Sequence, residues 1–129
     1  MNLHFTKMHG AGNDFIMIDD RNLSTPFEDY QLMAAIAARR TGIGCEGIIL
    51  VQPSEKADFK MRFLNTDGTE VELCGNGARC VAKFAHSLGI VGKTMTMETM
   101  AGVIDAEICD TGVKIWMPDP SRRHFDIDV

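Results

Sequence analysis

Apolar residues alternate with polar ones, or follow one another without a break, in eight short segments of the chain. These segments cover residues 3–8, 15–20, 47–52, 59–65, 70–73, 94–99, 102–109 and 112–117. Short runs of this kind, bounded by glycine, asparagine, aspartate or proline, are typical of β-strands. The turns "NTDG" (65–68) and "CDTG" (109–112) contain residues that tolerate tight or left-handed conformations. Each turn is therefore expected to join two antiparallel strands.

A first helix is expected to begin at "TPFE" (25–28). Thr25 can cap it, Pro26 fits the first helical position, and Glu28 can complete a capping box. The same helix is expected to end at "RRTG" (39–42), where basic residues and a glycine suit a carboxyl end. We expect this helix to lie on the surface.

A second helix is expected to start near Asn76 and to continue through residue 85. Its small and apolar residues are nearly continuous around the helix, so it needs cover on most sides. Eight strands and one such helix predict an α+β fold, in which a mixed, mostly antiparallel sheet curls around the central helix and the first helix packs outside. We assign this domain to residues 1–117. Residues 118–129, with two prolines and mixed charge, are expected to be a linker towards a second domain that is absent from this chain.

Composition and charge narrow the class of protein. The chain has 129 residues, 45% of them hydrophobic and 24% charged, which fits one folded domain. A formal net charge of -5, without a basic stripe, argues against a DNA or RNA partner. No apolar run is long enough for a membrane span or a signal peptide, so we expect a cytoplasmic protein. The four cysteines lack zinc-site spacing, so reduced thiols and no metal are expected.

Cys74 stands out within "LCGNGARC" (73–80). If the second helix starts near Asn76, Cys74 lies at its amino end, where unpaired N–H groups and the helix dipole stabilise a thiolate. Such a position can lower the pKa of a thiol from about 8.5 to roughly 3.5–7.5. The N–H groups of Gly75 and Asn76 could also hold a carboxylate or a phosphate. The other three cysteines are expected to be small buried hydrophobic residues, with Cys80 in the core.

Two asparagines are further candidates. "MHGAGNDF" (8–15) places Asn13 between two strands, and "FLNTDG" places Asn65 at the end of another. Their amides can offer a donor and an acceptor to a zwitterionic ligand, but asparagine beside glycine or aspartate more often forms a turn. Both roles stay open from the local sequence.

Four motifs together resemble a known family. "KMHGAGNDF", "RRTGIGCEG", "RFLNTDGTEVELCGNGARC" and "METMAG" have the order and about the spacing found in the amino-terminal half of the diaminopimelate epimerases. The resemblance covers residues 5–117 and implies a cytoplasmic enzyme that works without pyridoxal phosphate or another cofactor. Such an enzyme converts LL-diaminopimelate to the meso form, on the route to lysine and peptidoglycan. It also implies two similar domains that face one another across the active site.

The resemblance assigns roles by motif. Cys74 would be one of two catalytic cysteines, Asn13 and Asn65 would bind substrate, and Gly75 with Asn76 would offer main-chain N–H groups to the carboxylate at the reacting carbon. Inverting a carbon that bears a hydrogen needs a base on one face and an acid on the other, which two cysteines supply.

The chain departs from the family in one large respect and one small one. The second catalytic cysteine belongs to the second domain, so this chain holds half a site, and the expected partners are that domain or a second copy of the chain. Glu46 stands where the family commonly has an aspartate. Two alternatives remain at this point: a thiol-based redox or small-anion-binding module, and a different cofactor-independent racemase of the same fold.

Overall fold

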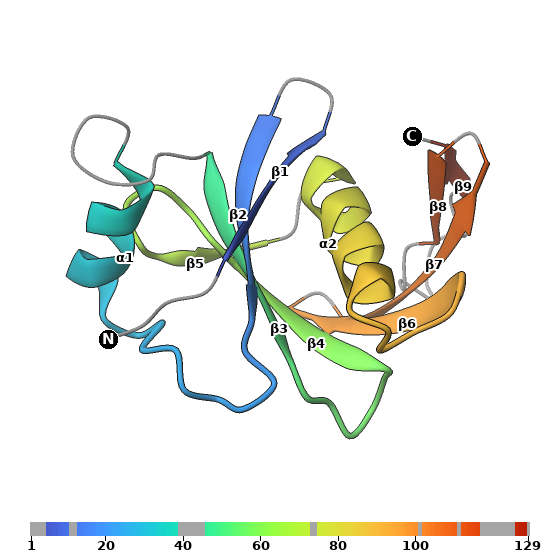
Figure 1. Ribbon diagram of the computed structural model, residues 1–129, viewed down its shortest axis with the longest axis horizontal. Coiled ribbons are helices and arrows are strands. Elements are labelled where there is room, and N and C mark those ends of the chain that lie inside the picture. Colours follow the sequence, from blue (N-terminus) through green and yellow to red (C-terminus); the bar gives the residue numbers. More distant parts are fainter. Residues whose placement is uncertain are drawn as a thin grey trace.

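The computed structural model describes residues 5–10, 13–38, 46–72, 75–100, 102–110, 112–116 and 126–128. It contains two helices and nine strands within those ranges (Figure 1). In chain order they are β1 (Thr6–Gly10), β2 (Asn13–Asp19), α1 (Tyr30–Ala37), β3 (Gly47–Gln52), β4 (Phe59–Leu64), β5 (Glu70–Val71), α2 (Gly75–Ser87), β6 (Thr94–Thr99), β7 (Gly102–Cys109), β8 (Gly112–Trp116) and β9 (Asp126–Asp128).

The strands form one mixed sheet in the order β1-β2-β3-β4-β6-β7-β8-β9, with β5 added to β4. The β2–β3 and β4–β6 pairs are parallel, and the other pairs are antiparallel. Helix α2 contacts β1 and β2 near one end of this order and β7 and β8 near the other (Figure 1). One sheet can touch a single helix from both sides only by curling around it, which confirms the predicted fold class.

Each face of the central strands carries its own apolar core. One face of β2, β3 and β4 packs with α2. The buried residues of this core include Phe15, Met17, Ile49, Val51 and Phe63 on the strands, and Val81, Ala82 and Ala85 on the helix. The opposite face packs with α1, through Ile16, Ile18, Ile48, Leu50, Leu64, Met33 and Ala37. Because β3 is covered on both faces, its sequence "GIILVQ" is almost uniformly apolar instead of alternating.

Helix α2 agrees with its prediction. It begins at Gly75, close to the expected start at Asn76, and Cys80 is only 3% exposed. The core role predicted for Cys80 is therefore confirmed. Cys109 is partly buried, with its Sγ 3.7 Å from Glu107 Oε1, and Cys45 lies outside the described residues.

The predicted bounds of the first helix are wrong, although its place on the outside of the sheet is confirmed. Helix α1 begins at Tyr30, and its cap is Asp29, whose Oδ1 accepts a hydrogen bond from Leu32 N–H at 3.1 Å. Thr25 caps no helix, because the residues after it form tight turns: Phe27 N–H donates to the carbonyl of Thr25 at 2.8 Å, and Asp29 N–H donates to the carbonyl of Pro26 at 3.1 Å. The helix ends at Ala37, because Ala38 has extended backbone.

The strand predictions agree with the structure to within a few residues at each end, and both predicted turns join antiparallel pairs. Within the segment assigned to a linker, residues 126–128 instead form β9, in which Ile127 pairs with Ile115 of β8. The alternation "DID" is thus that of an edge strand. The division into a domain and a linker to a second domain stays a prediction.

Candidate active site

The amino end of α2 is the centre of the candidate site. Gly75 and Asn76 are its first two residues, where backbone N–H groups find no acceptor within the helix. Cys74 directly precedes them in sequence and lies outside the described residues, as Leu73 does. The amino end of α2 lies beside the β1–β2 hairpin, near the end of β1 and the start of β2 (Figure 1).

Strand register brings both candidate asparagines to one end of the sheet. Phe15 of β2 pairs with Gly47 of β3, and Ile48 pairs with Leu64 of β4. Asn13 is the first residue of β2, and Asn65 follows the last residue of β4. With this register, both asparagines lie at the same end of three adjacent strands. Two strand spacings separate β2 from β4, or about 10 Å. The sequence motifs that contain these asparagines are far apart in the chain and close in the sheet.

Asn65 forms the turn that its local sequence favours. Its backbone N–H donates to Thr69 O at 2.8 Å, its carbonyl accepts from Gly68 N–H at 2.9 Å, and its Oδ1 accepts from Thr66 N–H at 2.9 Å. The side chain is exposed, and its Nδ2 has no partner within the part of the chain that the structure describes. A turn role and a free amide donor are thus combined in one residue. The side chain of Asn13 lies outside the described part of the structure.

Two neighbours of Asn65 fix this turn, and no sequence motif marked them as site residues. Asp67 Oδ1 accepts hydrogen bonds from Thr69 Oγ at 2.6 Å and from Thr69 N–H at 3.0 Å. These bonds favour the carboxylate and lower the pKa of Asp67 below its ordinary value. Gly68 has a φ of +87° and lies against the carbonyl of Tyr30 at the start of α1, where a Cβ would clash.

Gly47 provides room for an aromatic pair at the same end of the sheet. A Cβ at this position would meet the ring of Phe63, which packs edge-on against Phe15 with 5.9 Å between ring centroids. The sequence showed Gly47 only as part of a glycine-rich turn. Its role depends on a ring from the neighbouring strand, which no local pattern reveals.

An ion pair joins the two strands of the β1–β2 hairpin, whose second strand begins with Asn13. Lys7 Nζ of β1 lies 3.1 Å from Asp14 Oδ2 of β2, and Asp14 is 8% exposed. The carbonyl of Asp14 also accepts from Glu46 N–H at 2.8 Å, which ties the hairpin to the residue before β3. The position of Glu46 is thus held through its backbone.

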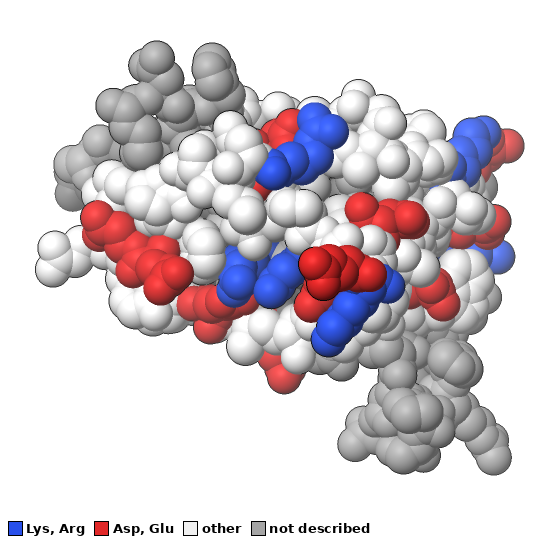
Figure 2. Space-filling view, turned by 90° about the horizontal axis from the view of Figure 1, so that it is seen from below, with Lys and Arg blue, Asp and Glu red and all other residues white. Residues whose placement is uncertain are grey.

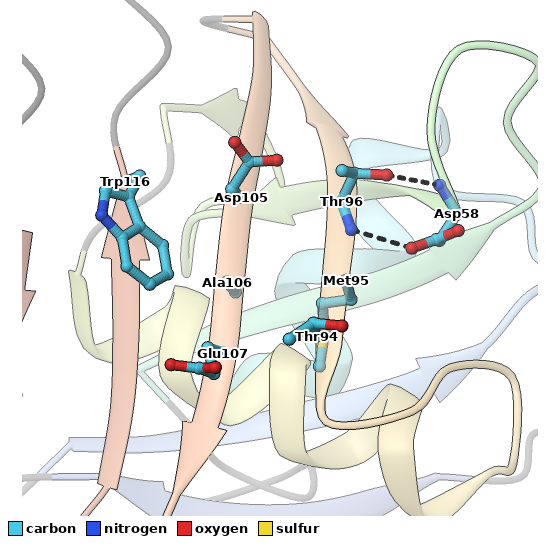
Figure 3. Close-up of a pocket in the computed structure, with 8 residues that line it drawn as sticks. All are labelled: Asp58, Thr94, Met95, Thr96, Asp105, Ala106, Glu107 and Trp116. Atoms are coloured by element: carbon cyan, nitrogen blue, oxygen red, sulfur yellow. Dashed lines mark hydrogen bonds between the residues drawn. The ribbon is translucent and has the colours of Figure 1, made fainter.

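A broad groove of about 560 Å³ lies elsewhere, on β6, β7 and β8 (Figure 3). The side chains of Thr96, Asp105 and Trp116 lie on the sheet face turned away from α2, and Asp58 is hydrogen-bonded to Thr96 (Figure 3). None of the described residues that line this groove is a predicted site residue, so the groove is separate from the candidate site.

Other classes of site find no support in the described residues. No group of three or more His, Cys, Asp or Glu residues there could hold a metal ion. No helix in the same ranges is long and apolar enough to cross a membrane. Acidic and basic side chains are interspersed on the face seen from below (Figure 2).

Comparison with known sequences decides the family. The sequence profile named diaminopimelate epimerase matches residues 5–123. The chain belongs to the diaminopimelate epimerase family. A diaminopimelate epimerase of Caldanaerobacter subterraneus subsp. tengcongensis is 47% identical over 98% of this chain and 47% of its own length. One of Geobacillus thermodenitrificans is 45% identical over 97% of this chain and 46% of its own length.

The chain therefore spans about half the length of the curated relatives it matches. The family match does not favour the alternative of a thiol-based redox or small-anion-binding module.

Solved structures of other proteins share the fold. A probable proline racemase from Agrobacterium radiobacter superposes with a TM-score of 0.68 at 18% identity, over 89% of this chain and 41% of that one. A PhzF-family phenazine biosynthesis protein from Bacillus anthracis has a TM-score of 0.62 at 24% identity, over 89% and 38% of the two chains. At these identities the likeness concerns the fold alone.

Proposed function

We propose that this chain supplies one half of the active site of an amino-acid epimerase that interconverts LL- and meso-diaminopimelate in the cytoplasm. The observation that carries the proposal is the family match across residues 5–123, which includes Cys74 and, directly after it in sequence, Gly75, the first residue of α2. The other half of the site is expected from a second domain. No cofactor is required for the chemistry described below.

In the proposed reaction Cys74 acts as one of two proton-transferring groups. As a thiolate it takes the proton from the α-carbon and becomes a thiol, while a thiol on the opposite face gives a proton to the same carbon and becomes a thiolate. The reverse direction exchanges the two roles. Because the second thiol comes from the second domain, inversion needs both halves.

The start of α2 favours this chemistry electrostatically. Negative charge develops on the α-carbon and the adjoining carboxylate, and N–H groups at the helix start can donate to that carboxylate. We assign this role to Gly75 and Asn76. The amides of Asn13 and Asn65, at the same end of the sheet, are proposed to bind polar groups of the substrate.

The test uses the protein encoded by the whole gene, incubated with LL-diaminopimelate in deuterated water. The wild type is expected to form meso-diaminopimelate with deuterium at the inverted carbon. Cys74→Ala should lower kcat by about 10² to 10⁴, the usual contribution of a general acid or base. Cys109→Ser is the matched control, because Cys109 is a partly exposed thiol in β7, outside the proposed site. Full activity in Cys74→Ala would refute the assignment.

A further inference from the structure

Arg62 of β4 is held on three sides. Its Nη1 donates to Glu70 Oε1 at 2.9 Å, and its Nε donates to Gln52 Oε1 at 2.9 Å. The guanidinium also lies over the ring of Phe27, 4.4 Å from its centroid. A fixed fork of donors that meets two acceptors and an aromatic face has little freedom to move.

The far end of this network is buried in the protein. Gln52 is 3% exposed, and its Nε2 donates to Asp20 Oδ2 at 2.8 Å. Asp20 is 1% exposed, and its other oxygen accepts from Thr25 N–H at 2.8 Å. Arg62 is thus anchored to the ends of β2 and β3, which belong to the rigid centre of the sheet.

At its other end, the network reaches Glu70 of β5, a strand that is only weakly paired with the sheet. β5 has only two residues in register with β4, Glu70 opposite Leu64 and Val71 opposite Phe63. The Arg62–Glu70 pair crosses the same two strands and adds a side-chain bridge to this short ladder. Glu70 stands five residues after Asn65 and five before Gly75. Its position therefore influences both the Asn65 turn and the approach of the chain to α2.

We propose that Arg62, through its ion pair with Glu70, is a positioning residue that holds the β4–β5 hairpin, and with it Asn65, in the geometry that binds substrate. This inference rests on the proposed function. Both side chains are about one quarter exposed, and pairs of this kind contribute little to global stability. A shift of the hairpin, in contrast, acts directly on the site, where a displacement of about 1 Å can cost about a hundredfold in rate.

The experiment compares Arg62→Met, Glu70→Ala and Glu70→Gln in the protein encoded by the whole gene. Arg62→Met and Glu70→Ala should raise the KM for diaminopimelate at least about tenfold in the folded protein. Glu70→Gln keeps an acceptor oxygen, so it should raise the KM by a smaller factor than Glu70→Ala. Arg62→Lys should fail to restore the wild-type KM, because one ammonium group cannot reproduce the fork between Gln52 and Glu70.

The matched control removes another arginine–carboxylate pair at the end of β2. Arg21 Nε and Nη2 lie 2.8 Å and 2.7 Å from the two oxygens of Asp19, away from the β4–β5 hairpin. Arg21→Met should leave the KM unchanged. A general loss of stability would reduce the amount of folded enzyme in any of these variants without changing the KM of the folded fraction.

Amide hydrogen exchange separates this inference from the proposed function. The N–H groups of Asn65 and Gly68, which close the turn, should exchange faster in Arg62→Met and Glu70→Ala than in the wild type, and no faster in Arg21→Met. If the wild type does not invert diaminopimelate, the proposed function fails while the exchange still tests the positioning role. Unchanged KM and unchanged exchange at both amides in Glu70→Gln, Glu70→Ala and Arg62→Met would overturn the inference.

Discussion

At the scale of single residues, the cysteines differ in what surrounds them. Cys80 is 3% exposed in α2, and Cys109 is partly buried in β7. Cys74 is followed directly by the first residue of α2, where helix N–H groups favour a thiolate. We predict that Cys74 reacts fastest with an alkylating reagent at neutral pH, as read by mass spectrometry of the labelled peptides. Faster labelling of Cys109 would contradict the helix-end argument.

Asp67 gives a prediction for pH. Because bonds from the Thr69 hydroxyl and N–H lower the pKa of Asp67 in the folded state, the carboxylate stabilises the fold at pH values above its unfolded pKa of about 3.9. This contribution is lost as the pH falls through the lower, folded pKa. The stability difference between wild type and Asp67→Asn should therefore shrink below about pH 4 in urea titrations. In a Thr69→Val background, the stability difference between the proteins with and without Asp67→Asn should depend less on pH, because the hydroxyl donor is gone. An equally strong pH dependence in that background would show that the Thr69 hydroxyl does not lower the pKa of Asp67.

At the scale of elements, the cap of α1 can be tested directly. Asp29 accepts from Leu32 N–H, so Asp29→Ala should lower the free energy of unfolding by about 1 kcal/mol. Thr25, the cap that the sequence favoured, lies five residues before the helix, and Thr25→Ala should cost less than about 0.5 kcal/mol. Urea titration of both variants decides between them. A larger loss in Thr25→Ala would favour a helix that starts at Thr25.

Gly68, in the turn between β4 and β5, and Gly89, just after α2, make a matched pair of glycines. Gly68 and Gly89 have φ values of +87° and +78°, so alanine is strained at both, by about 1 kcal/mol or more. A Cβ at Gly68 would also clash with the carbonyl of Tyr30, whereas a Cβ at Gly89 meets nothing within 4 Å. Gly68→Ala should therefore lose more unfolding free energy than Gly89→Ala. Equal losses would show that the turn does not pack tightly on α1.

The elements also show what a sequence can predict. Strands β3, β6 and β7 have the predicted bounds, because a continuous or alternating apolar run and its flanking turn residues are local signals. The start of α1 was mispredicted, because residues 25–29 form turns beside the carboxylate of Asp20, whose burial depends on the tertiary fold. The Arg62–Gln52–Asp20 network has no signature in the sequence for the same reason, since its members lie on three strands or their ends.

At the scale of the whole molecule, the sequence indicates candidate residues for the site but not their layout. The order of the motifs along the chain is enough to indicate Asn13, Asn65, Gly75 and Asn76 as candidates. Only the strand register places Asn13 and Asn65 at one end of the sheet. Their contact with substrate, and the role of Cys74, remain proposals.

The chain covers about half the length of its curated relatives, and the two-base mechanism predicts what the chain can do on its own. A single thiolate that removes a proton can return one only to the same face, so the 129-residue chain alone should not form meso-diaminopimelate from the LL isomer. Exchange with solvent should also be negligible, because a half-site open to water lacks the desolvation and the second set of donors that stabilise a carbanion.

The measurement follows isotope and stereochemistry at the reacting carbon in deuterated water. The protein encoded by the whole gene serves as the positive control, and its Cys74→Ala variant as the negative one. Inversion by the short chain that rises with the square of its concentration would indicate that a second copy supplies the opposite thiol. Inversion proportional to concentration would place both bases within this chain, and the two-cysteine assignment across two domains would be wrong.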